Sequence, residues 1–136
     1  MKMLLLEANI DDERQTVVIR TREVKMSDSN SVERLKEYYR LLDCRCIDIR
    51  EVEINGKYFD LIVDDEGMLT ERPIPTFYVE EDKVVLFGNI LFAHCNEDGE
   101  TIGLEDSELP MLANYVGENL KKLQIFLTSV REKQDS

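Results

Sequence analysis

The chain has 136 residues, of which 43% are apolar, and a formal net charge of −12. This length predicts one domain with a core of its own, and no apolar run is long enough to form a membrane-spanning helix. The apolar stretch from Met3 to Leu6 is too short for the core of a secretory signal peptide. Three cysteines do not suit a disulfide framework, so we expect a reducing, cytoplasmic location.

The negative charge is concentrated in the middle of the chain. Residues 51–108 contain 16 Asp and Glu but 3 Lys and Arg, whereas the remainder contains 13 acidic and 14 basic residues. An acidic field repels phosphates, so we expect no direct binding of nucleic acid. The same field attracts a basic protein surface, either directly or by imitating a nucleic acid. The alternative is that the charge serves solubility alone.

The N-terminal third predicts a β-hairpin followed by a helix. Strands are expected over residues 3–8 and 16–22. A helix over 31–43 is expected to begin at Asn30 or Ser31, where Asn30 and Glu33 have the spacing of a capping box. Four apolar residues at helical intervals predict its buried face: Val32, Leu35, Tyr39 and Leu42.

The central region predicts further strands. Strands over 46–54 and 57–63 are joined by Asn55-Gly56, a strong hairpin signal. The apolar alternation changes parity within the first of them, which predicts a bulge near Arg50-Glu51. Gly67 is expected to take a positive φ in the acidic turn that follows.

The next segments are less regular. Two prolines within residues 72–78 remove backbone donors and predict an irregular, extended piece. The apolar run 84–95 is either two strands or one strand bent at Gly88. A brief strand is expected over 101–104.

From Asp106 onward the apolar period becomes helical, with Asp106 or Ser107 as the cap and Gly117 as a point where the helix can break in two. Seven residues form a near-heptad apolar stripe: Leu109, Leu112, Val116, Leu120, Leu123, Leu127 and Val130. The helix either folds back across the sheet or packs on a second copy as a homodimer.

These elements predict an α+β fold. An antiparallel sheet of about five to seven strands packs on one helix, and a long C-terminal helix lies outside it. Residues 1–104 form the sheet part and residues 105–136 the helical segment of the same single domain.

Metal and catalytic sites have little support in the sequence. The four side chains that suit zinc are Cys44, Cys46, His94 and Cys95, but their spacing is not that of a zinc knuckle, and adjacent strand residues point to opposite faces. We therefore expect no metal and no cofactor.

Arg45 could lower the pKa of Cys44, but no base is near it in sequence. The chain has one histidine and no nucleophile elbow, P-loop or dinucleotide motif, so we expect no enzyme. Turnover that depends on His94 or Cys95 would reverse that expectation.

Five residues combine a guanidinium, a hydroxyl, two aromatic rings and an amide: Arg72, Thr76, Phe77, Tyr78 and Asn89. Such a set can stack on a base and pair with a phosphate. The alternative is that Arg72 forms a surface ion pair and that the aromatic residues belong to the core.

The stretch from Ser31 to Val116 resembles a family of small uncharacterised domains found mainly in phages, plasmids and conjugative elements of Gram-positive bacteria. The resemblance rests on several short motifs: Cys46-Ile47-Asp48-Ile49, the strand and acidic turn 59–67, the proline segment 72–76, Gly88-Asn89-Ile90-Leu91-Phe92, and the acidic segments 97–100 and 103–108. The chain departs from the family at Asn89, where threonine is preferred, and in the proline segment, where an Asn-Arg pair is usual. The resemblance implies an accessory protein of a mobile element, with no known reaction.

Together these features suggest a non-enzymatic binding protein that counters a host defence. In the first hypothesis, the acidic surface of residues 51–108 binds a basic host protein. In the second, an oligomer sequesters a small nucleotide-type signal through Arg72, Tyr78 and Asn89. A small enzyme is the third.

Overall fold

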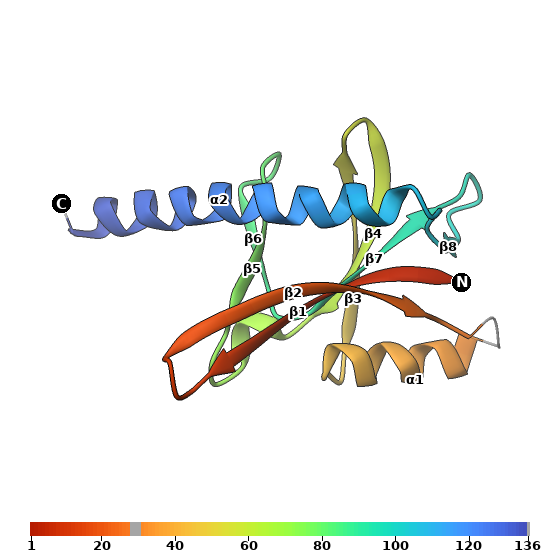
Figure 1. Ribbon diagram of the computed structural model, residues 1–136, viewed down its shortest axis with the longest axis horizontal. Helices are drawn as coiled ribbons and strands as arrows, with labels where there is room; N and C mark the ends of the chain where they lie inside the picture. Colours follow the sequence, from red (N-terminus) through yellow and green to blue (C-terminus); the bar gives the residue numbers. More distant parts are fainter. Residues whose placement is uncertain (28–30, 136) are drawn as a thin grey trace.

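The computed structural model describes residues 1–27 and 31–135 and has the α+β architecture that the sequence predicts (Figure 1). In chain order the elements are β1 (Lys2–Asp11), β2 (Thr16–Lys25), α1 (Ser31–Leu42), β3 (Ile47–Ile54), β4 (Lys57–Asp64), the 3₁₀ helix η1 (Gly67–Leu69), β5 (Pro75–Val79), β6 (Val84–Phe87), β7 (Ile90–Cys95), β8 (Thr101–Ile102) and α2 (Glu108–Asp135). No helix in the described part of the chain is long and apolar enough to cross a membrane.

The main sheet is antiparallel and six-stranded, with the order β2-β1-β7-β4-β3 and with β8 beside β7. Strands β5 and β6 form a separate hairpin. Helix α1 covers one face of the main sheet, and α2 runs along the other side with the β5–β6 hairpin (Figure 1). The strands at the centre are buried on both faces, which explains the nearly continuous apolar runs 3–6 and 90–93.

The sheet separates two apolar cores. The larger lies on the α2 side and includes Phe59, Phe77, Phe92, Leu112 and Val116. The smaller lies on the α1 side and includes Met3, Leu5, Tyr38, Leu42, Ile62 and Leu91.

The bulge predicted near Arg50-Glu51 is wrong, because the β3–β4 register is unbroken from Ile47 to Ile54. The change of parity has another cause. Val52 and Ile54 belong to the larger core, whereas Ile47 packs against the smaller one on the opposite face. Because both faces of β3 are covered, at different ends of the strand, an unbroken strand shows both parities.

The predicted hairpin at Asn55-Gly56 is confirmed, with φ angles of 52° and 83° that fit a type I′ turn. The positive φ predicted for Gly67 is wrong, since this residue begins η1. A Cβ at Gly67 would lie 3.0 Å from the backbone oxygen of Phe87, so close packing is the reason for glycine here.

Of the two alternatives for residues 84–95, the structure shows two strands. Strands β6 and β7 belong to different sheets and separate at Gly88, whose φ is 79°. The irregular piece is shorter than predicted, because Pro75 already begins β5.

The face predicted for α1 is partly wrong. Tyr38 and Leu42 are buried, whereas Val32 is 60% exposed and Leu35 is 37% exposed. The helix packs through its C-terminal half, where Tyr38, Leu41 and Leu42 contact the smaller core. The apolar side chains of its first turns are therefore uncovered. The predicted cap at Asn30 lies outside the described residues.

Helix α2 is continuous from Glu108 to Asp135, so the predicted break at Gly117 is wrong. Gly117 is exposed, and an exposed glycine in a helix costs only about 1 kcal/mol.

The apolar stripe of α2 is buried in its first part and exposed in its last part. Leu112, Val116 and Leu123 are buried within the chain, whereas Leu127 and Val130 are 38% and 37% exposed. Figure 1 shows the last turns of α2 extending beyond the sheets. The homodimer remains a prediction, now restricted to these last turns.

Candidate functional site

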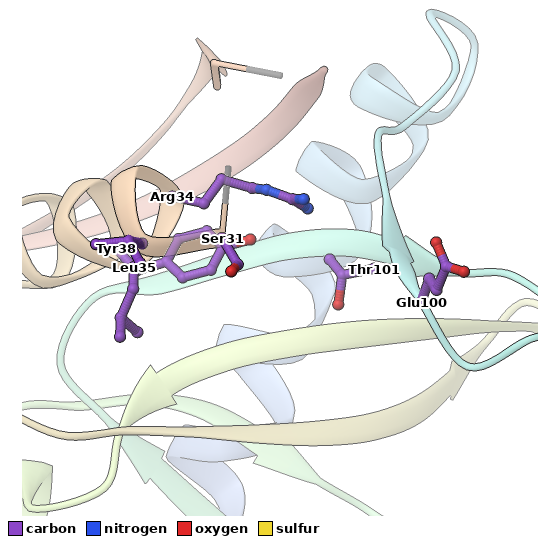
Figure 2. Close-up of a pocket in the computed structure, with 7 residues that line it drawn as sticks. Ser31, Arg34, Leu35, Tyr38, Glu100 and Thr101 are labelled. Carbon is purple, nitrogen blue, oxygen red and sulfur yellow. The ribbon is translucent and has the colours of Figure 1, made fainter. Parts of the chain in front are cut away.

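A groove lies between the first turns of α1 and the β7–β8 turn (Figure 2). We call it the α1 groove, and its volume is about 500 Å³. It is lined by Ser31, Val32, Arg34, Leu35, Tyr38, Glu100 and Thr101. The uncovered apolar residues of α1 form one wall, and the acidic turn forms the other.

Arg34 and Tyr38 are the polar residues of α1 whose surroundings in the groove are unusual. The Nε atom of Arg34 is buried and has no hydrogen-bond partner among the described residues. Figure 2 shows this side chain extending from α1 across the groove. Burial raises the pKa of Tyr38, and the nearby charge of Arg34 partly opposes that shift. The Nε–H of Arg34 is therefore a buried donor without a described partner at the edge of the groove.

An acidic cluster lies on the same face of the sheet, next to the α1 groove. The register pairs Glu51 of β3 with Asp60 of β4, and Cys95 of β7 with Thr101 of β8. One ligand atom of each of Glu51, Asp60 and Cys95 lies within 4.8 Å of the others. Asp60 is buried, and its Oδ2 accepts a hydrogen bond of 3.1 Å from the Thr101 hydroxyl. Burial, and then the charges of Asp60 and Glu51, raise the pKa of the Cys95 thiol.

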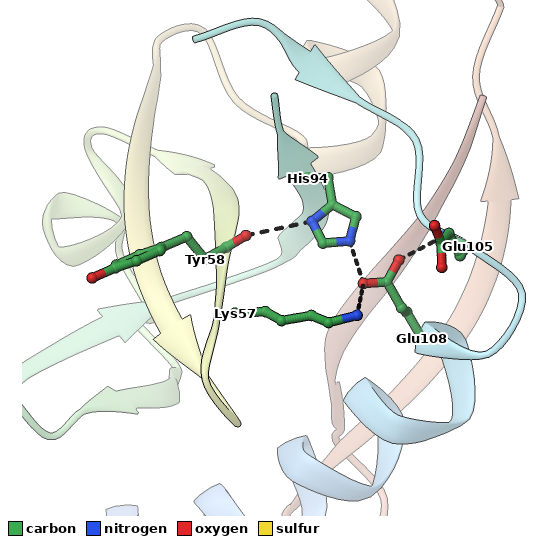
Figure 3. Close-up of polar contacts among 5 residues, drawn as sticks. All are labelled: Lys57, Tyr58, His94, Glu105 and Glu108. Atoms are coloured by element: carbon green, nitrogen blue, oxygen red, sulfur yellow. Dashed lines mark hydrogen bonds and ion pairs between the residues drawn. The ribbon is translucent and has the colours of Figure 1, made fainter. Parts of the chain in front are cut away.

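The opposite face of the sheet holds a second polar cluster (Figure 3). His94 Nε2 contacts Oε2 of Glu108, a carboxylate whose side chain is only 3% exposed. His94 Nδ1 lies 3.4 Å from the backbone oxygen of Tyr58, and its ring stacks on Phe59 at 4.6 Å between centroids. Lys57 Nζ lies 3.9 Å from the same Glu108 oxygen. The two ring nitrogens and the ring face are thus all in contact with the protein.

Glu108 also determines how α2 begins. Its Oε1 accepts a 2.8 Å hydrogen bond from the backbone N–H of Glu105, and its own N–H donates to the Glu105 oxygen at 3.0 Å. This is the glutamate half of a capping box in which Glu105 is the N-cap, one residue before Asp106 and two before Ser107, the predicted caps. Asp106, which the sequence suggested as the cap, forms an ion pair with Lys2 at 2.5 Å.

Three of the predicted ligand residues have their groups engaged elsewhere. Arg72 Nη2 lies 3.2 Å from Oδ1 of Asp12 at the surface. The buried Thr76 hydroxyl donates to the Gly88 oxygen at 2.8 Å, and Phe77 lies in the larger core.

The other two predicted ligand residues also have internal partners. Asn89 Oδ1 accepts from Ala8 N at 3.0 Å, and its Nδ2 donates to the Leu41 oxygen at 3.1 Å. Tyr78 stacks on Phe126 of α2 at 4.6 Å. Arg72 and Asn89 share a pocket of about 200 Å³, but Thr76, Phe77 and Tyr78 do not line it. The structure does not bring the five together.

Asn119 is a buried polar residue for which the sequence predicts no role. It lies on α2 and is 1% exposed. Its Oδ1 accepts from Tyr78 N at 2.8 Å, and its Nδ2 donates to the Tyr78 oxygen at 2.7 Å. The side-chain amide thereby supplies β5 with the two bonds that a neighbouring strand would supply. The only signal was an asparagine beside the apolar stripe.

The cysteines do not converge. His94 points to the α2 side of the sheet and Cys95 to the α1 side, as predicted for adjacent residues of a strand. Cys44 and Cys46 lie before β3. Burial, and then the charge of Asp64, raise the pKa of Cys44 to about 11.

Cys46 is therefore expected to be alkylated well before Cys44. At about pH 8 only about one Cys44 thiol in a thousand is ionised, and Cys46 is exposed. Alkylation of Cys44 should accelerate as the pH rises toward 11. Trypsin cleaves after Arg45 and separates the two cysteines, so mass spectrometry of the peptides gives both rates, with Cys46→Ser as the control. Equal rates at about pH 8 would contradict the prediction.

Comparison with known proteins gives a family but no function. A search of curated proteins and a search of solved structures both find no match. A family profile described as "Domain of unknown function (DUF3846)" matches residues 10–117, which span β2 to the first turns of α2 and include both polar clusters. The chain therefore belongs to the DUF3846 family of domains of unknown function.

Proposed function

We propose that the protein is a non-enzymatic accessory protein of a phage or mobile genetic element. It binds a basic segment of a host protein in the α1 groove and thereby counters a host defence. The observation that supports this proposal is the uncovered apolar wall of the groove, formed by Val32 and Leu35, opposite an acidic turn.

The groove has the features of a recognition site. Its volume lies within the range of about 300–1,000 Å³ that is common for ligand sites. Adjacent exposed apolar side chains that line a groove are typical of interaction surfaces, whereas single ones are ordinary. Val32 and Leu35 are one helical turn apart and both line the groove.

The polar groups favour a basic polypeptide as the ligand. Glu100 lies in the groove and Glu51 in the adjacent acidic cluster, so a lysine or arginine of the ligand would find opposite charge. An apolar residue next to the basic one would contact Val32 and Leu35.

The nucleotide hypothesis has less support. The α1 groove contains one guanidinium, Arg34, but the carboxylates of Glu100, Glu51 and Asp60 at and near the groove outnumber it and repel phosphate. In the pocket that contains Arg72 and Asn89, the arginine is paired with Asp12 and both amide atoms of the asparagine already have partners. A non-enzymatic role is supported by His94, whose ring nitrogens both contact protein oxygens.

Replacing Val32 and Leu35 together by serine is expected to weaken binding of basic-apolar peptides by about tenfold or more, because apolar burial against the ligand is lost. The probes are labelled peptides that alternate apolar residues with Lys or Arg, compared with Glu-containing counterparts. Fluorescence anisotropy at about 50 mM and about 500 mM salt measures the affinity, which should fall at high salt.

The matched control is the double variant Met68→Ser and Leu69→Ser, which removes two adjacent exposed apolar side chains from another surface. Its affinity should equal that of the wild type. Absence of binding at low salt, or equal losses in the two double variants, would contradict the proposal. Thermal stabilisation by a nucleotide that is lost in Arg72→Ala would favour the second hypothesis instead.

A further inference from the structure

We propose that Glu51, Asp60 and Cys95 form a binding site for a divalent zinc ion. The site goes beyond the proposed peptide binding and does not depend on it. It lies on the α1 side of the sheet, where three adjacent strands contribute one ligand each.

The sheet register brings these side chains together. Glu51 and Asp60 are directly paired across β3 and β4, and Asp60 is paired with Ala93 of β7. Paired residues share a face of the sheet, and so do residues two apart along a strand. Cys95, two residues after Ala93, therefore shares this face. The ligand atoms lie within 4.8 Å of one another.

The burial of Asp60 is an independent observation that favours a cation. This carboxylate is 5% exposed on a central strand, and its one hydrogen bond among the described residues comes from the neutral hydroxyl of Thr101. Buried carboxylates are normally paired with a cation or a metal. The other buried carboxylate, Glu108, has His94 and Lys57 as partners. The side chains that converge on Asp60 are instead an acid, Glu51, and a thiol, Cys95.

The donor set favours zinc over magnesium or calcium. A thiolate is a soft ligand that selects zinc, and two carboxylate oxygens complete a common zinc environment. In a tetrahedral zinc site the ligand atoms are about 3.3–3.7 Å apart, given zinc–ligand bonds of about 2.0–2.3 Å. A pair of ligand atoms at the full 4.8 Å would therefore have to approach by about 1 Å, and the exposed side chain of Glu51 can move toward the other two ligands. Three protein ligands leave a fourth position for water.

Titration of chelator-treated protein with zinc chloride in a calorimeter tests the site. One zinc ion should bind per chain, and Cys95→Ser and Glu51→Gln should each weaken binding by about tenfold or more. Asp60→Asn should do the same, but Glu51 is exposed, so Glu51→Gln remains informative if Asp60→Asn fails to fold. With cobalt as the probe, a thiolate-to-metal absorption band should appear in the wild type and be absent from Cys95→Ser.

Two matched controls give the test its specificity. Glu53→Gln changes an exposed glutamate two residues along the same face of β3, and Cys46→Ser changes the exposed cysteine. Both should bind zinc within about twofold of the wild type. Absence of zinc binding by folded wild-type protein would overturn the proposal. Equal affinity of Cys95→Ser and wild type, or loss of binding in Cys46→Ser, would also overturn it by placing the ion elsewhere.

Discussion

Asn119→Ala is expected to lower the free energy of unfolding by about 2–4 kcal/mol. The substitution removes both hydrogen bonds to the backbone of Tyr78, at 2.8 and 2.7 Å. A buried donor or acceptor left without a partner costs about 1–3 kcal/mol, and two such groups are left here. Urea denaturation monitored by circular dichroism measures the loss.

Asn114→Ala is the matched control, because Asn114 lies on the same helix but is exposed. Alanine has the higher helix propensity, so this variant should be neutral or slightly more stable than the wild type. Equal destabilisation of the two variants would show that the loss at position 119 does not come from the bonds to β5. Since Tyr78 also stacks on Phe126, the β5–β6 hairpin should be the first element to lose hydrogen-exchange protection.

His94→Ala is expected to lower the free energy of unfolding by about 2–4 kcal/mol, because it removes the principal partner of the buried Glu108 carboxylate. Lys57, at 3.9 Å and largely exposed, compensates only in part. The loss of the ring stacked on Phe59 adds to the effect. Denaturant unfolding of the purified variant provides the measurement.

A double-mutant cycle separates the two contributions. In a Glu108→Gln background no buried charge needs a partner, so His94→Ala should cost at least about 1 kcal/mol less than in the wild type. Glu105→Gln, which changes an exposed side chain beside Glu108, is the control and should change stability by less than about 0.5 kcal/mol. If the effects of His94→Ala and Glu108→Gln are simply additive, the contact between these side chains does not explain the loss.

Local patterns predicted most of the secondary structure. The Asn55-Gly56 turn, the strands beside it and the long C-terminal helix all follow from short-range signals of turn chemistry and apolar period. The register of that two-residue hairpin also places Glu51 opposite Asp60. The pairing of Glu51 with Asp60 could therefore be derived from the sequence, provided that β3 is taken as a strand without a bulge.

Other features depend on which elements pack together. The apolar spacing of α1 is compatible with more than one buried face, and the sheet selected Tyr38 and Leu42 while leaving Val32 and Leu35 to line a groove. The change of apolar parity in β3 suggested a bulge. It arises instead because the strand is covered on both faces, so its apolar residues do not follow a single alternation.

The sequence by itself determined the α+β class, the hairpin register and the acidic centre of the chain, because these depend on neighbouring residues and on composition. Only the tertiary structure decided which polar groups are buried and with what partners. Asn119 meets Tyr78 across 41 residues, and Glu108 meets His94 between a helix and a strand. Such pairings depend on the relative placement of elements, which no local period encodes.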